Sequence, residues 1–340
     1  MKKENPDLKN TIASELLAAT GKAYRGEKLF LTLLGAVTLV GVAAWVVQLK
    51  QGLVVTAMRD YVSWGIYIAL LFFFVGISLV GAFVSSVLRF SGAAWRHSLT
   101  RIAEAVTLSA ILFAAFMPVL DMGRPERLFF LVSHGRIQSP ILWDVVAILT
   151  YLAGSLLYFY LPLIPDLALM RDNLPGISAC KKKMFGWMSL GWNGSPAQRR
   201  LLERGMRILS VVILPVAVSV HTISAWLIAM TVRPGWNTSL MGPYFVFGAL
   251  MAGCAVLILV TSLLRRVYRL EHYLTPLHFR NLGACLLVLA AFYLYLTLNK
   301  YGVPAYTMEK GERKVLDDLF FGHFSPLFWF VQLAGTALPI

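Results

Sequence analysis

Long apolar runs separated by shorter polar stretches dominate the chain. Seven of them approach or exceed the roughly 20 residues that a helix needs to cross a bilayer. They cover about residues 29–49, 61–88, 102–120, 141–165, 208–230, 241–264 and 281–299. An eighth begins near Ser325 and stops at Ile340, which is short for a span. This pattern predicts an all-α polytopic membrane protein with about eight visible spans, the last of them incomplete, and we expect further helices or a partner to complete that end.

The composition supports a membrane protein and excludes several other classes. Of the 340 residues, 58% are hydrophobic and only 14% are charged, whereas a soluble domain carries about 25% charged residues. The mean hydropathy is +0.69. These values exclude a soluble enzyme, a nucleic-acid binder and a disordered scaffold. The net charge of +14 is explained by cytoplasmic loops, so the expected surroundings are the lipid bilayer and no nucleic acid.

The distribution of cations predicts the orientation. With the N-terminus inside, the inner segments carry about twice as many of the 31 lysines and arginines as the outer ones, as the positive-inside rule requires. We therefore expect a multi-pass protein of a bacterial-type cytoplasmic (inner) membrane with a cytoplasmic N-terminus. The first 28 residues are polar and the first apolar run is long enough to span, so no cleavable signal is expected. The inner loop 166–207 carries Trp187 and Trp192 beside a lysine run, which is typical of an interfacial segment.

Cysteine and histidine positions give little support for a bound redox centre. Cys180, Cys254 and Cys285 are far apart and form no Cys-x-x-Cys motif, which argues against a cysteine-ligated iron–sulfur cluster. Haem held by two histidines needs a facing pair within the membrane, and only His221 is deeply placed. We expect no intrinsic haem, no iron–sulfur cluster and no metal site.

Three polar groups lie at overlapping depths in consecutive spans, where each needs a partner or a function. Asp121 ends the third span, Asp144 lies one turn into the fourth, and His221 lies in the fifth. Each also has a structural interpretation. The Asp144 carboxylate could interact favourably with the dipole at a helix N-terminus. Asp121 could form an ion pair with Arg124 or Arg127, and His221 could form a hydrogen bond between helices. Their shared depth favours one site near the outer face.

Helical periodicity places further polar residues in two stripes. On the fourth span, Asp144 shares a face with Tyr151, Ser155 and Tyr158; on the second, the shared face carries Ser63, Tyr67, Ser78 and Ser85. Either stripe alone is explained by helix packing. Together they indicate a hydrated lane that protons could follow, with Glu104 near the inner face as one end. Glu104 does not share a face with Asp121, so such a path must cross between helices.

Four stretches of the chain resemble the NrfD-like family of quinone-reactive membrane subunits, as in polysulfide reductase and alternative complex III. They are DMGRPERLFF at 121–130, the segment 139–172 that begins SPILWD, the segment 221–253 that contains RPGW, and, less tightly, 63–83. The resemblance implies two four-helix bundles with outer helices, and about ten spans in all. It also implies a quinol site in the first bundle near the outer face. Some members have a histidine where this chain has Asp121.

These residues suit quinone chemistry on physical grounds as well, because quinol oxidation releases two protons with two electrons. Asp121 and Asp144 could accept the protons, and His221 could hydrogen-bond a quinone oxygen. The predicted pocket for quinone or quinol (menaquinone or ubiquinone) is completed by Trp143 as a wall, Arg124, Ser139 and Tyr67. The predicted proton path comprises Tyr151, Ser155, Tyr158, Ser78, Ser85 and Glu104.

The predicted organisation has four parts. They are a cytoplasmic segment (1–28), a peripheral first helix with an outer loop (29–60), the first bundle with the quinone site (61–230), and a second, incomplete bundle (231–340). Since no electron carrier is evident, electrons must pass to a neighbour. The resemblance implies an outer-face iron–sulfur (ferredoxin-like) subunit, a multihaem cytochrome subunit or both, with other membrane subunits of the same complex. A transporter or proton channel without a redox role, and a purely structural anchor, are the alternatives.

Overall fold

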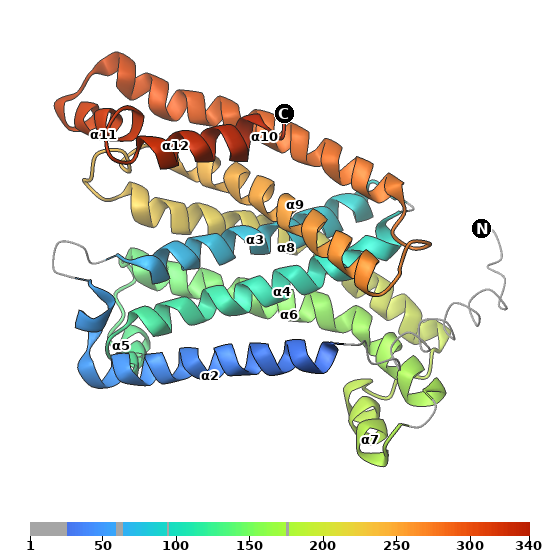
Figure 1. Cartoon of the computed structure of the whole chain (residues 1–340). Coiled ribbons are helices and arrows are strands. Elements are labelled where there is room, and N and C mark those ends of the chain that lie inside the picture. Colours follow the sequence, from blue (N-terminus) through green and yellow to red (C-terminus); the bar gives the residue numbers. More distant parts are fainter. Residues whose placement is uncertain (1–25, 59–63, 94, 175–176) are drawn as a thin grey trace. The chain divides into compact units, whose positions relative to one another are not determined.

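The computed structural model describes residues 26–58, 64–93, 95–174 and 177–340, and all regular structure in them is helical (Figure 1). Seven helices are long and apolar enough to cross a membrane. They are α2 (Glu27–Gln51), α3 (Ile66–Phe90), α4 (Arg96–Asp121), α6 (Pro140–Asn173), α8 (Pro196–Ala229), α9 (Met241–Val267) and α10 (Pro276–Thr307). The prediction of an all-α polytopic membrane protein is confirmed.

Short helices occupy the connections and the end of the chain. They are η1 (Leu53–Thr56), η2 (Pro125–Arg127), α5 (Leu128–Ser133), α7 (Ala179–Met188), α11 (Lys310–Phe320), α12 (Ser325–Gln332) and the π-helical turn η3 (Leu333–Ala337). The expected eighth, incomplete span corresponds to α12 and η3, which together are shorter than any of the seven spans. Ser63 of the second predicted stripe and most of the predicted N-terminal segment 1–28 lie outside the described residues.

Most of the described residues of the predicted inner loop 166–207 are helical. Helix α6 continues past two internal prolines to Asn173, α7 follows, and α8 already begins at Pro196. Hydropathy marks where a helix leaves the hydrocarbon core of the membrane, whereas the helical hydrogen bonds of the backbone continue into the charged residues beyond it. The side chains of Arg171 and Tyr160 hold the turn after α7: Arg171 donates to the Ser189 hydroxyl (3.1 Å), and Tyr160 donates to the Met188 carbonyl (2.6 Å).

The chain divides into two compact units. One comprises Met1–Gly65 with Tyr160–Arg204, and the other comprises Ile66–Phe159 with Gly205–Ile340. The second unit contains α3, α4, α9 and α10 together with the adjoining parts of α6 and α8, so it holds helices from both predicted bundles. The boundary between those bundles stays a prediction.

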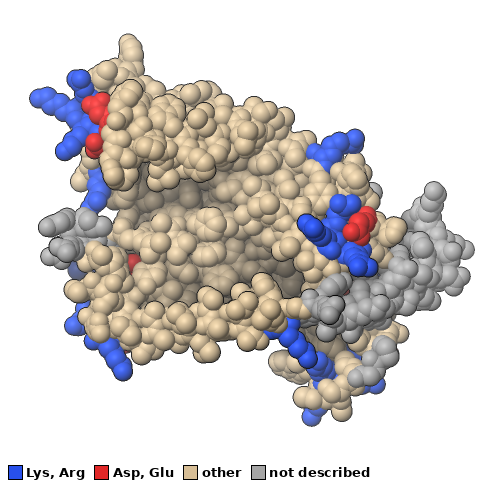
Figure 2. All heavy atoms as spheres, viewed as in Figure 1, with Lys and Arg blue, Asp and Glu red and all other residues tan. Residues whose placement is uncertain are grey.

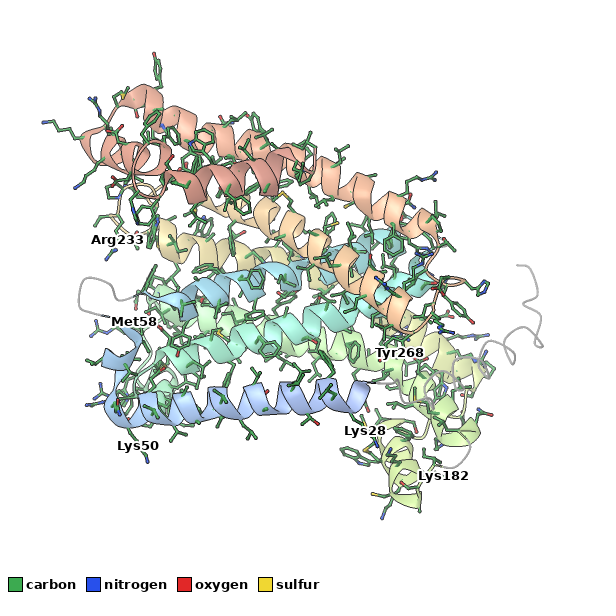
Figure 3. All side chains as sticks on the ribbon, viewed as in Figure 1. Lys28, Lys50, Met58, Lys182, Arg233 and Tyr268 are labelled. Carbon is green, nitrogen blue, oxygen red and sulfur yellow. The ribbon has the colours of Figure 1, made fainter. Side chains whose placement is uncertain are left out.

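Polar residues mark the two ends of the second unit's helices. Arg233 and Tyr268 lie at opposite ends of α9 (Figure 3). Where α9 to α12 are seen in Figure 2, lysine, arginine and acidic side chains gather at the helix ends and leave a surface without charged side chains between them. At the Tyr268 end, the His278 ring at the start of α10 lies 3.2 Å from the carbonyl of Trp95, in the connection between α3 and α4. This arrangement is that of a membrane-spanning bundle.

Helix α3 is the most buried of the seven spans, and small residues allow its neighbours to approach it closely. A Cβ atom added at Gly81 would overlap the carbonyl oxygen of Ala103 and the Thr107 hydroxyl, both on α4. At Gly253 of α9, an added Cβ would lie 2.7 Å from Cβ of Val80. Both positions therefore require glycine because a neighbouring helix approaches closely, and not because the backbone adopts an unusual conformation.

Replacing Gly81 with alanine is expected to lower the melting temperature of the detergent-solubilised protein, because the clash with the α4 backbone must be relieved at a cost of about 1–3 kcal/mol. Gly283→Ala on α10 is the matched control, since an added Cβ there meets nothing within 4 Å. The control should melt at or slightly above the parent temperature, because alanine favours helix. Equal melting of the two variants would contradict the close α3–α4 contact.

Candidate functional site

The interior between α3, α4, α6 and α8 is polar. Its buried hydroxyl, carboxyl and imidazole side chains come from all four helices and are those of Ser78, Ser85, Glu104, Thr107, Asp144, Ser155, His221 and Ser224. Hydrocarbon offers no hydrogen bonds, so these groups must satisfy one another or the backbone. Four of the eight residues that sequence periodicity assigned to the two stripes are in this set, and Tyr151 and Tyr158 from the same stripes are also buried.

The carboxylate of Asp144 is the acidic group nearest the start of α6 in this interior, and it is only 5% exposed. Its Oδ1 atom accepts a hydrogen bond of 2.5 Å from the hydroxyl of Ser224 on α8. Sequence reasoning missed Ser224, although its position one turn after His221 on the same helix was a usable signal. A hydroxyl and a carboxylate in contact form a pair that can hold and pass a proton.

His221 is fully buried and contacts two backbone carbonyls. Its Nδ1 lies 2.6 Å from the oxygen of Ala217, and its Nε2 lies 2.6 Å from the oxygen of Val75 on α3. This geometry agrees with the interpretation of His221 as a bond between helices. A quinone oxygen could reach the ring only after one of these contacts opens. A neutral imidazole donates to one carbonyl, whereas a protonated ring donates to both.

The carbonyl of Ser78 on α3 joins two further helices. Tyr151 of α6 donates its hydroxyl to this oxygen at 2.7 Å, and Thr107 of α4 donates to it at 2.8 Å. Tyr151 is fully buried and its ring lies edge-on to that of His221, with centroids 6.3 Å apart. Tyr151 and Ser78 thus meet as predicted, although through a backbone oxygen, while Thr107 was not anticipated.

Two helical turns along α3, a second polar cluster joins the same three helices. The Ser85 hydroxyl donates to Oε1 of Glu104 (2.9 Å) and lies 3.0 Å from the hydroxyl of Tyr158. Oε2 of Glu104 lies 3.7 Å from Nη1 of Arg101. Between the clusters, Ser155 lies near the Tyr151 phenol and its buried hydroxyl forms no hydrogen bond within the described residues. Five of the six predicted path residues therefore belong to two clusters, and the sixth, Ser155, lies between them.

Asp121 ends α4 and is separate from these contacts. Its Oδ1 is buried and has no hydrogen-bond partner among the described residues. Arg124 and Arg127 are exposed, and within the described part of the chain neither forms an ion pair with Asp121. The ion pair that was one interpretation of Asp121 is thus absent from the described structure. The Asp121 carboxylate is therefore available for other contacts.

The remaining predicted pocket residues are spread over the same end of the helices. Trp143 is 51% exposed, donates its indole N–H to the Ile137 carbonyl (2.6 Å), and lines a cavity of about 290 Å³ between α6 and α8. The lining of that cavity does not include Asp144, Asp121 or His221, because Trp143 faces a different side of α6. The Ser139 carbonyl accepts the Trp143 backbone N–H (3.3 Å), and Tyr67 is half-buried in the first turn of α3.

Comparison with known proteins shows that the chain is similar to subunits of reductases. It is 29% identical over 332 residues to a putative dimethyl sulfoxide reductase membrane subunit from Halobacterium salinarum, covering 97% of this chain and 72% of the relative. It is 22% identical over 323 residues to a selenate reductase subunit from Mesobacillus selenatarsenatis, covering 92% of this chain and 74% of the relative. Residues 54–340 match the family described as polysulphide reductase, NrfD. This match spans most of the chain and confirms the resemblance seen in the sequence, so the protein belongs to the NrfD polysulphide reductase family.

Proposed function

We propose that this chain is the quinone-reactive membrane subunit of a multi-subunit reductase complex. It oxidises quinol or reduces quinone near the outer face and exchanges electrons with a partner subunit. Family membership supports a membrane redox role, and two relatives are named as subunits of reductases. The observation that carries the proposal is the buried Asp144–Ser224 pair within a membrane-spanning bundle, because a carboxylate held there at the cost of desolvation needs a function.

Partner subunits follow from the chemistry of the reaction. Quinol oxidation delivers two electrons, and within the described residues no three histidine, cysteine, aspartate or glutamate side chains are grouped to hold a metal ion. The names of the relatives indicate complexes with a separate reductase subunit. We infer that an iron–sulfur subunit, a multihaem cytochrome or both dock at the outer face. The N-terminus then lies in the cytoplasm, an orientation that the distribution of lysine and arginine supports.

In this proposal the chain's own residues handle the protons. Asp144 takes a proton from the quinol hydroxyl and exchanges it with Ser224, to which it is already hydrogen-bonded. Asp121, whose buried Oδ1 has no partner in the described structure, takes the second. Tyr67 supplies an aromatic wall, and the exposed Arg124 contacts a docked partner. His221 holds α8 against α3 through its contact with the Val75 carbonyl and thereby maintains the shape of the pocket.

Replacing Asp144 with asparagine is expected to reduce quinol-dependent electron transfer by roughly 10²–10⁴-fold, the usual contribution of a positioned acid or base. The assay uses membranes that contain the assembled complex, with subunit content checked by immunoblot. Asp172→Asn is the matched control, because it changes an exposed carboxylate near the other end of the same helix and should leave turnover unchanged. Full turnover of an assembled Asp144→Asn complex would refute the catalytic role and favour a structural anchor.

We also propose that the two polar clusters carry protons across the bundle. The cluster nearer the inner face is continuous from Tyr158 through Ser85 to Glu104, and Tyr151 begins the one nearer the outer face. Hydroxyl groups can both donate and accept, so each can relay a proton. About two helical turns, or roughly 10 Å, separate Ser78 from Ser85 along α3, and transfer across this gap needs Ser155 and a bridging water.

The double variant Tyr151→Phe, Tyr158→Phe removes a hydroxyl from each cluster and leaves the ring packing intact. We expect the ratio of protons translocated to electrons transferred to fall, while quinol-dependent electron transfer continues. The measurement is proton release and uptake by liposomes that contain the whole complex. Tyr160→Phe is the control, because the Tyr160 hydroxyl bonds the Met188 carbonyl, outside both clusters. An unchanged ratio in the double variant would rule out this route.

A further inference from the structure

A second cavity, of about 500 Å³, lies between α3, α8, α9 and α10. Its walls are mostly aliphatic and aromatic, with Phe72 and Phe73 from α3 and Phe245 from α9. Polar atoms lie at one end, where Tyr244, Tyr293 and Lys300 complete the lining. The Asp144–Ser224 pair and the residues of the two polar clusters do not line this cavity, so it is separate from the site described above.

The lysine at the polar end has unusual neighbours. Nζ of Lys300 lies 4.3 Å from the ring centroid of Tyr244 and 5.8 Å from that of Tyr301, with the sulfur of Met241 at 3.9 Å. Tyr293 stacks on Tyr244 and donates its hydroxyl to that of Tyr244 (2.7 Å). The ammonium therefore rests on aromatic faces, which attract a cation without neutralising its charge.

The described residues supply no counter-ion in contact with Lys300. No carboxylate among them forms an ion pair with it, and the acid that acts on it from a greater distance is Glu312. The Oε1 atom of Glu312 already accepts the backbone N–H of Gly235 (2.8 Å). A partly buried ammonium beside hydrocarbon is costly without an anion. The charge of this pocket is thus complementary to an anionic ligand.

The depth of Lys300 agrees with a lipid headgroup. The sequence placed this residue in an outer loop, whereas α10 continues past it to Thr307. Lys300 lies beside Met241, the first residue of α9, and therefore at the level where that helix emerges. Arg233 and Trp236, which contact one another in the preceding connection (5.8 Å), lie at the same end of α9, as Figure 3 shows for Arg233. Aromatic and basic residues at this level are typical of the membrane–water interface.

We propose that this cavity binds one anionic phospholipid. The lipid phosphate accepts hydrogen bonds from Nζ of Lys300, and an acyl chain lies against the apolar wall formed by α3 and α9. A free phosphate would leave the apolar wall uncovered, and a neutral quinone would leave the ammonium without a counter-ion. An amphiphile with an anionic head and an apolar tail satisfies both ends of the cavity. This inference does not depend on the proposed quinone chemistry.

The test is native mass spectrometry of the purified whole complex, titrated with phosphatidylglycerol and, in parallel, with zwitterionic phosphatidylcholine. Lys300→Gln should weaken phosphatidylglycerol binding by about fivefold, the effect of one cation near a lipid headgroup, while Lys300→Arg should retain it. Lys310→Gln is the matched control, since Lys310 is exposed on α11, and should bind like the parent. The weak phosphatidylcholine binding should be the same in all variants.

A second variant separates charge from packing. Ala252→Phe fills the apolar part of the cavity and leaves Lys300 in place, so it should also reduce phosphatidylglycerol binding. Size-exclusion profiles and melting temperatures show which variants keep the fold. Equal phosphatidylglycerol binding in the parent, Lys300→Gln and Ala252→Phe would overturn the proposal. Saturable binding of a ubiquinone analogue that is lost in Lys300→Gln, without a change for phosphatidylglycerol, would overturn it in favour of a second quinone site.

Discussion

The interior of the second unit depends on hydrogen bonds that end on the backbone of α3. Burial of apolar surface does not hold helices together in lipid, because the lipid tails are equally apolar. Here α8 reaches the Val75 carbonyl through His221, whereas α6 and α4 reach the Ser78 carbonyl through Tyr151 and Thr107. Three helices are thus fixed to α3 within one turn. Close approach at Gly81 brings α4 near enough for this to happen.

The need for hydrogen bonds between helices explains why residues that hold the helices together also have roles in the proposed proton chemistry. A hydroxyl placed to bond a neighbouring helix remains able to pass a proton when its partner is a carboxylate or another hydroxyl. Ser85, Tyr158 and Glu104 have that kind of contact, and so do Asp144 and Ser224. Tyr151 and Thr107 donate to carbonyls, which accept but do not relay, so the proposed transfer past Tyr151 uses Ser155 and a bridging water. The fixed carbonyl contacts therefore hold the helices, and in the proposed function the acid–hydroxyl contacts beside them carry the exchangeable protons.

Sequence patterns predicted the spans and the polar face of each helix, because hydropathy and a period of 3.6 residues depend only on local chemistry. They placed Asp144, Tyr151 and Tyr158 correctly on one inward face. They did not identify Ser224 or Thr107 as partners: the position of Ser224 one turn after His221 was a usable signal for its face, but periodicity gives a direction and not the neighbour that occupies it. Trp143 was assigned to the same pocket as Asp144, although one residue along a helix turns the side chain by about 100°. The predicted spans were shorter than α6, α8 and α10, because these helices continue beyond the hydrocarbon core of the membrane.

Two charged groups of opposite sign illustrate how surroundings determine what a buried charge can do. Asp144 contacts a hydroxyl, a partner that can relay a proton to it, so neutralisation by uptake of a proton is the available response. Lys300 contacts ring faces and a thioether sulfur, none of which can accept its proton or balance its charge, and the proposed lipid phosphate supplies an anion in contact with it. Asp144 lies near the start of α6 and Lys300 near the end of α10, toward the predicted outer face in both cases. One end of the bundle thus combines a carboxylate suited to exchanging protons and a cation suited to holding an anionic lipid.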